Sequence, residues 1–205
     1  VDAAIAGFED ILTAEERSGL KEKLLGFFRD RARNLFAETG RPGLPGGIAP
    51  DTFDAAFGAS TQAGTEYSWE NIPGLVSRLQ ALQAFRDRAE FAQIAETFKR
   101  VNNILKDAST SADADNLDAT ILTAADKDLL QAFLDTRVRI SIAAGSNEWD
   151  KALTLISGLH QPVSRFFADV MVNDPDIAVR TARQKLLGAV RESVLQVADF
   201  SAFQG

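Results

Sequence analysis

The chain has 205 residues, of which 45% are hydrophobic, and a formal net charge of −7. This is enough apolar material for a full core, in one elongated domain or in a large and a small lobe. The absence of cysteine and the single histidine, His160, exclude a disulfide framework, a Cys/His zinc site and a Cys/His nucleophile pair. No apolar run approaches the roughly 20 residues that span a bilayer, so we expect a cytoplasmic protein without membrane contact.

The first predicted elements are helices. Thr13 and Glu16 form a capping box, and the apolar spacing after it predicts one long amphipathic helix to about Glu38. Four glycines and three prolines between residues 40 and 50 predict a turn-rich connector. A short helix is expected over residues 51–57.

Helices also dominate the rest of the chain. We expect them at residues 72–86 and 88–106, then a flexible loop at 109–116 and a helix that Thr123 caps and that ends near residue 144. Two separate helices are expected near 145–158 and 161–171, and a last one from about 174 to 198. The predicted fold is all-α, an irregular bundle of about eight helices.

The charge is distributed unevenly along the chain. Residues 72–106 hold six basic and three acidic residues, a balance of +3, whereas residues 107–135 hold seven acidic residues and one lysine, a balance of −6. A polyanion such as RNA is held mainly by Lys and Arg, so the first of these segments is a candidate for binding one. Ordinary solvated helix faces are the alternative interpretation.

No catalytic constellation stands out. The glycine-rich stretch at residues 43–47 follows a helix and lacks the Lys-Ser/Thr pair of a phosphate loop, so it is interpreted as a connector. Asp113, Asp115 and Asp118 superficially suggest calcium, but the central glycine and terminal glutamate of an EF-hand are missing. The chain begins at Val1 and its one methionine is Met171, so we expect it to be a piece of a larger protein. Because no catalytic motif is found, we expect this piece to bind a partner and not to catalyse a reaction.

Several polar residues are placed by helical spacing. Arg31 and Arg183 fall inside apolar stripes, so we expect both to be partly buried in internal salt bridges. Asn102 lies at the edge of such a face and is interpreted as structural. The residues that point away from their stripes, and are therefore available to a ligand, are Arg29, Arg33, Arg100 and Asn103.

Four stretches carry a resemblance to a known family. Residues 98–105, Phe-Lys-Arg-Val-Asn-Asn-Ile-Leu, closely resemble a string of the C-terminal region of the bacterial-type glycyl-tRNA synthetase beta subunit. Residues 27–36, residues 78–85 and the tail from Pro162 to Ser201 are similar to further elements of that family, in the same order. The tail also resembles the DALR-type domains of arginyl-tRNA synthetase. Ser164, Arg165 and Asn173 depart from the pattern.

This resemblance implies a DALR-like anticodon-binding helical domain at residues 61–205, preceded by an N-terminal helical segment at 1–60 that packs on it. It implies glycine tRNA, the alpha subunit and the remainder of beta as partners in an alpha2beta2 assembly, and no DNA. In such an assembly the alpha subunit carries the chemistry with ATP and Mg, so no cofactor is expected in this piece. The alternative is a structural domain that docks against other subunits and touches RNA little.

We expect cationic and amide side chains to form the tRNA surface, the former on phosphates and the latter on splayed bases. They are Arg29, Arg33, Arg78, Arg86, Lys99, Arg100, Asn103 and Lys106. Base stacking would come from arginine planes or from Tyr67 and Trp69, for which packing of their loop onto the bundle is the alternative.

Overall fold

A computed structural model of the chain describes residues 2–8, 10–40, 46–62, 71–106, 108 and 111–203. These residues form eight α-helices and one 3-10 helix, with no strand among them, which confirms the predicted all-α class. Their contacts divide the chain into two compact units, Val1–Pro50 and Asp51–Gly205. No helix in the described ranges combines the length and the apolar character needed to cross a membrane.

The division falls between residues 50 and 51, and not between 60 and 61 as the sequence suggested. The reason is helix α3 (Pro50–Gln62), which is longer than predicted and belongs with the second unit. The backbone N–H of Asp199 donates to the Ala55 carbonyl at 2.9 Å, and the Thr52 hydroxyl donates to Gln83 at 3.2 Å. These bonds join α3 to segments far along the chain.

The first unit consists of α1 (Asp2–Ala6) and α2 (Ala14–Ala37). Thr13 and Glu16 cap α2 reciprocally, as the capping box predicts, but α2 contains no buried residue. Arg31 is therefore exposed, and the expectation of partial burial was wrong. An apolar stripe shows only where a helix can be covered. Among the described residues of the first unit this stripe is covered in part, since Leu24 is half-buried but Phe28 and Leu35 are exposed.

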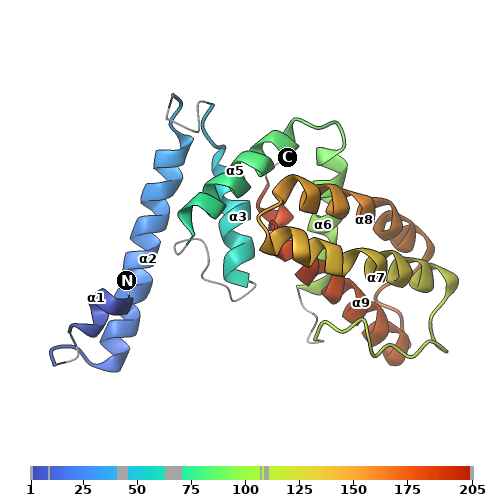
Figure 1. The fold of residues 1–205 in the computed structure, drawn as a ribbon. Coiled ribbons are helices and arrows are strands. Elements are labelled where there is room, and N and C mark those ends of the chain that lie inside the picture. Colours follow the sequence, from blue (N-terminus) through green and yellow to red (C-terminus); the bar gives the residue numbers. More distant parts are fainter. Residues whose placement is uncertain are drawn as a thin grey trace. The chain divides into compact units, whose positions relative to one another are not determined.

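The second unit continues with α5 (Ile72–Arg86), α6 (Phe91–Leu105), α7 (Ala124–Gly145), α8 (Trp149–Asp169), α9 (Ile177–Leu195) and η1 (Phe200–Ala202). Helices α7 and α8 lie side by side and are joined by a tight turn (Figure 1). In this turn Asn147 adopts a φ of 57°, and the N–H of Glu148 donates to the Ala143 carbonyl at 2.8 Å. The left-handed residue satisfies the end of α7 in the manner of a helix C-cap.

Helix α8 is one continuous helix, whereas two were predicted on either side of Gly158 and Pro162. A proline inside a helix removes one backbone hydrogen bond and usually ends or kinks it. Here both halves bury the same face: Leu153 and Ile156 precede the proline, and Val163 and Phe166 follow it, all fully buried. Burial of this shared face outweighs the one lost bond.

Aromatic rings at the C-terminal end of the chain anchor the core around α6. Phe200 of η1 lies 5.6 Å from Phe98 and 6.4 Å from Phe85, measured between ring centroids. Phe203 lies 5.0 Å from Phe91, close to edge-on. Such pairs each contribute about 0.5–1.5 kcal/mol beyond their burial, so the tail after α9 holds α5 and α6 in place.

A buried charge pair joins α7 to α9. Arg183 is 4% exposed and donates to both carboxylate oxygens of Asp126, at 3.0 and 3.4 Å, and to Asp174 at 3.0 Å. Asp126 also accepts from the backbone N–H and hydroxyl of Thr123, at 2.7 Å each, and so caps α7. Burial alone would raise the pKa of Asp126, but the hydrogen bonds from Arg183 and Thr123 hold that pKa below its ordinary value.

We expect Asp126→Asn to lower the free energy of unfolding by about 3–5 kcal/mol, because it leaves a buried guanidinium without its main counter-charge. Urea unfolding at neutral pH, followed by circular dichroism, measures this change. Asp128→Asn is the matched control, since Asp128 lies on the same turn of α7 but is exposed. A loss below about 1 kcal/mol would contradict the assigned role.

The same pair predicts acid sensitivity. The pKa of Asp126 is lower in the folded chain than in the unfolded one. The ionised Asp126 therefore stabilises the fold fully at any pH above its unfolded-state pKa of about 3.9, and this stabilisation is lost as the pH falls through its folded-state pKa. The urea midpoint should therefore drop below about pH 4, and this drop should be smaller in Asp126→Asn. An equal drop in both proteins would assign the acid sensitivity to other carboxyls.

Candidate nucleic-acid interface

Helix α6 has one face in the core and one in solvent. Ile94, Phe98 and Val101 are buried, as the amphipathic pattern of this helix requires. The opposite face presents four of the predicted tRNA-binding residues, all exposed: Lys99, Arg100, Asn103 and Lys106. Residues three and four apart share a helix face, so these side chains gather on one surface, which we call the α6 face.

Helix α8 fixes one side of α6. The hydroxyl of Thr97 and Nδ1 of His160 share a hydrogen bond of 2.8 Å. One turn further along α6, the guanidinium carbon of Arg100 lies 4.3 Å from the centroid of the Phe167 ring. His160 is thus a half-buried structural residue between two helices.

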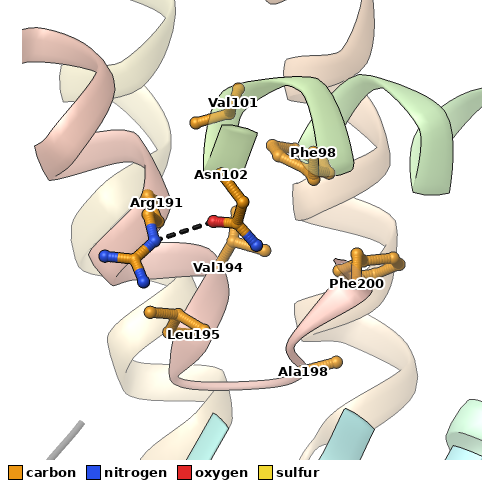
Figure 2. Close-up of a pocket in the computed structure, with 8 residues that line it drawn as sticks. All are labelled: Phe98, Val101, Asn102, Arg191, Val194, Leu195, Ala198 and Phe200. Atoms are coloured by element: carbon orange, nitrogen blue, oxygen red, sulfur yellow. Dashed lines mark hydrogen bonds between the residues drawn. The ribbon is translucent and has the colours of Figure 1, made fainter. Parts of the chain in front are cut away.

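Asn102 fixes the other side of α6 (Figure 2). Its amide oxygen accepts from Nε of Arg191 on α9 at 2.7 Å, and its amide nitrogen donates to Asp199 at 3.1 Å. The small pocket beside this amide, bounded also by Val194 and Phe200, has about 10 Å³ of space, which is close to the room of one water molecule. Asn102 is therefore a structural link between three segments, and a nucleobase does not fit there.

The α6 face is cationic and open. Glu96 is the only acidic residue within α6, and within the described ranges the side chains of Lys99, Asn103 and Lys106 make no hydrogen bond or ion pair. A cation that is not already paired keeps its full attraction for a phosphate. The α6 face therefore has the charge and the accessibility that a polyanion requires, although the chain as a whole is acidic.

Arg78 was predicted on the tRNA surface, and its burial corrects this assignment. It is 7% exposed, and its Nε donates to the Val197 carbonyl at 2.5 Å while its guanidinium lies 5.2 Å from the Trp149 ring. Burial lowers the pKa of Arg78 to about 10, so the side chain is still charged at neutral pH. Helix α5 is apolar over most of its surface, and sequence spacing alone therefore could not separate an inner from an outer side.

Arg86 also has a structural role in place of the predicted one. It is half-buried, forms an ion pair with Asp51, and donates to the Thr52 hydroxyl at 3.1 Å. Its guanidinium lies 5.8 Å from the Phe91 ring and 5.5 Å from the Phe203 ring. These contacts bind α3 to α5 and leave Arg86 little freedom to meet a ligand.

The remaining described candidates lie on α2, in the first unit. Arg29 and Arg33 are half-buried on α2 and have contacts of their own in the structure, and their role in binding stays a prediction. They belong to the first unit, whereas the α6 face belongs to the second. Tyr67 and Trp69 lie outside the described residues.

The acidic segment before α7 is partly neutralised by the bundle. Arg137 donates to both carboxylate oxygens of Asp115, at 2.6 and 2.7 Å, and this contact lowers the pKa of Asp115. The pKa of Asp113 is lowered mainly by hydrogen bonds from Asn116, with Lys185 nearby at 3.8 Å. Among the described residues no three acidic or histidine side chains form a metal site.

A larger hollow of about 560 Å³ lies between α5 and the start of α8. Its rim carries Glu148 and Asp150 as well as Lys151, and Lys151 is paired with Glu148 at 2.7 Å. Its net charge is therefore negative. A phosphate backbone is disfavoured there, in contrast to the α6 face.

Comparison with known families matches residues 94–199 to the DALR anticodon binding domain. The chain belongs to the DALR anticodon binding domain family. All four residues of the α6 face fall within the matched segment, as do Asn102 and Arg183. Arg29, Arg33, Arg78 and Arg86 fall outside it, and these are the candidates that the structure places in other roles or in the other unit.

Relatives named glycine–tRNA ligase beta subunit resemble almost the whole chain of this DALR protein. The one from Pseudomonas aeruginosa (strain LESB58) is 35% identical over 98% of this chain and 27% of its own length. Those from Janthinobacterium sp. (strain Marseille) and Rhodospirillum centenum are 31% and 32% identical, over 95% and 89% of this chain and 27% and 24% of their own lengths. The resemblance stated from sequence is confirmed, and the chain spans about a quarter of these relatives.

We expect Arg78→Ala to lower the free energy of unfolding of the chain by roughly 2–4 kcal/mol, because it opens a cavity and leaves a buried carbonyl without its donor. Chemical denaturation measures this loss. The salt dependence of RNA binding should stay as in the unchanged chain, since a buried arginine holds no phosphate. If Arg78→Ala reduced the salt dependence of RNA binding and left the free energy of unfolding unchanged, Arg78 would be a phosphate-binding residue, as first predicted.

Proposed function

We propose that this chain binds the anticodon arm of glycine tRNA through the α6 face. The single observation that carries the proposal is the exposed set of Lys99, Asn103 and Lys106, whose side chains have no partner among the described residues and which lies beside Arg100 within the segment that matches an anticodon binding domain. Lysines hold phosphates as point charges, and an amide can both donate to and accept from the edge of a splayed base.

The relatives' name supports a place for the chain within a larger glycine–tRNA ligase. In that assembly, which we propose to be alpha2beta2 and cytoplasmic, the alpha subunit carries ATP, Mg and the activation of glycine. The chain itself contributes recognition and no cofactor. Its described residues fit this division, because the site is a charged surface and not a cleft with paired acids and bases.

We expect Lys99→Ala and Lys106→Ala each to weaken binding of glycine tRNA by about 1.5 kcal/mol, roughly tenfold, since each removes a charge-assisted contact to phosphate. Each should also reduce the slope of log affinity against log salt by about one. Fluorescence anisotropy over a salt series measures both. Lys127→Ala is the matched control, because it changes the net charge equally from the exposed surface of α7.

If the effect were only one of net charge, Lys127→Ala would weaken binding as much as the α6 variants, and the α6 face would not be the binding site.

Glycine tRNA with substituted anticodon bases provides a second comparison. The unchanged chain should discriminate against the substituted tRNA, and the lysine variants should weaken both RNAs by the same factor, because phosphate contacts carry no sequence information.

One observation favours a second function, docking against another protein surface. Val138 and Ile142 lie one turn apart on α7 and are 59% and 60% exposed. Neighbouring exposed aliphatic side chains occur at protein interfaces. In this second candidate, α7 contacts the alpha subunit or another part of a longer beta subunit.

Docking predicts that Val138→Ser with Ile142→Ser leaves tRNA binding by the isolated chain unchanged but weakens assembly with a separately produced alpha subunit about tenfold or more. Size-exclusion chromatography with light scattering measures the assembly. Exposed Ser141→Ala on the same helix is the control. Equal assembly by the unchanged chain, the double variant and the control would rule out docking of α7 against the alpha subunit.

A further inference from the structure

Arg100 differs from the lysines of the α6 face because it is already held on an aromatic ring. Its guanidinium carbon lies 4.3 Å from the Phe167 centroid, closer than any of the cation–ring distances of Arg78, Arg86, Arg88 and Arg137, which run from 5.1 to 6.0 Å. A guanidinium stacks on a ring through its flat face and is weakly hydrated there. Arg100 is therefore a positioned group and not a freely moving charge.

The ring beneath Arg100 is itself fixed. Phe167 is 9% exposed and packs against the fully buried Phe166 at 5.8 Å between centroids. The Thr97–His160 hydrogen bond, one turn earlier on α6, holds the two helices together beside the ring. Helices α6 and α8 thus set the position of Arg100 before any ligand arrives, which reduces the conformational entropy lost on binding.

Arg100 nevertheless remains exposed. The ring covers one side of its guanidinium, and in the described part of the chain no carboxylate pairs with it. Its polar neighbours on the same helix face are Asn103, three residues further along, and the exposed Glu96, four residues earlier. A flat cation with a free side, next to an amide, has the features of a nucleobase stacking site.

We propose that Arg100 and Phe167 form a stacking platform for one unpaired nucleobase of the bound RNA, with Asn103 facing the edge of that base. Lys99 and Lys106 hold phosphates on either side of it. This assignment rests on the proposed RNA binding and divides the α6 face into one base site and a flanking phosphate track. A base in a helical stem is already stacked on both sides, so the ligand of the platform is a loop nucleotide.

The decisive variant is Arg100→Lys, which keeps the charge and removes the flat stacking surface. With the anticodon stem-loop of glycine tRNA as probe, we expect its affinity to fall about tenfold while the salt slope stays that of the unchanged chain. Arg139→Lys, on the exposed surface of α7, is the matched control and should change neither. Equal thermal unfolding temperatures would exclude a purely structural effect.

An abasic series in the loop of the probe locates the base. Removing the stacked base should weaken binding by the unchanged chain but not by Arg100→Lys, because in that variant the stacking contact is already lost. Phe167→Leu should reproduce the loss if it folds, and Arg100→Lys decides the question if it does not.

The outcomes separate the platform from the proposed function. If Arg100→Lys binds the intact loop as tightly as the unchanged chain, or if no abasic position couples to it, the platform is wrong while RNA binding by the α6 face stands. If the unchanged chain shows no salt-dependent RNA binding, both the proposed function and the platform are overturned.

Discussion

The amide of Asn102 sets the orientation of α6, on which the candidate site depends. It accepts from Arg191 on α9 (Figure 2) and donates to Asp199 just before η1, so one side chain joins three segments. Asp199 is buried, and a buried carboxylate without such donors would be costly. With α8 fixing the opposite side through Thr97, α6 cannot rotate about its axis without breaking hydrogen bonds on both sides. The cations of its outer face are therefore held in solvent.

The net charge is a poor guide to the ligand of this chain, because several acidic side chains are paired within the bundle whereas the lysines of the α6 face are not. Hydrogen bonds from Arg137 lower the pKa of Asp115, and those from Arg183 and Thr123 lower that of Asp126 against the effect of burial. The pKa of Asp113 is lowered mainly by hydrogen bonds from Asn116, and Lys185 lies 3.8 Å away. The lysines of the α6 face form no ion pair among the described residues, although Glu96 is exposed three residues before Lys99 on the same helix. Within a Debye length of about 8 Å at physiological salt, a phosphate meets mainly these lysines.

Sequence reasoning predicted helices, caps and the α6 face, but it could not assign the arginines of α2 and α5. Spacing places a residue on a side of a helix, and burial depends on which partner covers that side. Arg183 lies in an apolar stripe that α7 covers and is buried with Asp126, whereas Arg31 lies in a stripe that the first unit leaves open. Arg78 lies on α5, which is apolar nearly all round, so its sequence does not show which side faces the core and which faces solvent. The Arg100–Phe167 contact joins residues 67 positions apart, which no local pattern reveals.

The two kinds of cation in this domain suggest how recognition without catalysis is built. Arginines with several donors in a fixed plane are used where geometry matters: Arg183 joins two carboxylates, Arg86 pairs with Asp51, and Arg100 lies on a ring. Lysines on the α6 face are flexible point charges, suited to a phosphate backbone whose exact path varies. In the proposed arrangement, a rigid base platform beside adaptable phosphate contacts would accept RNA of the right loop shape and leave discrimination to one ordered contact.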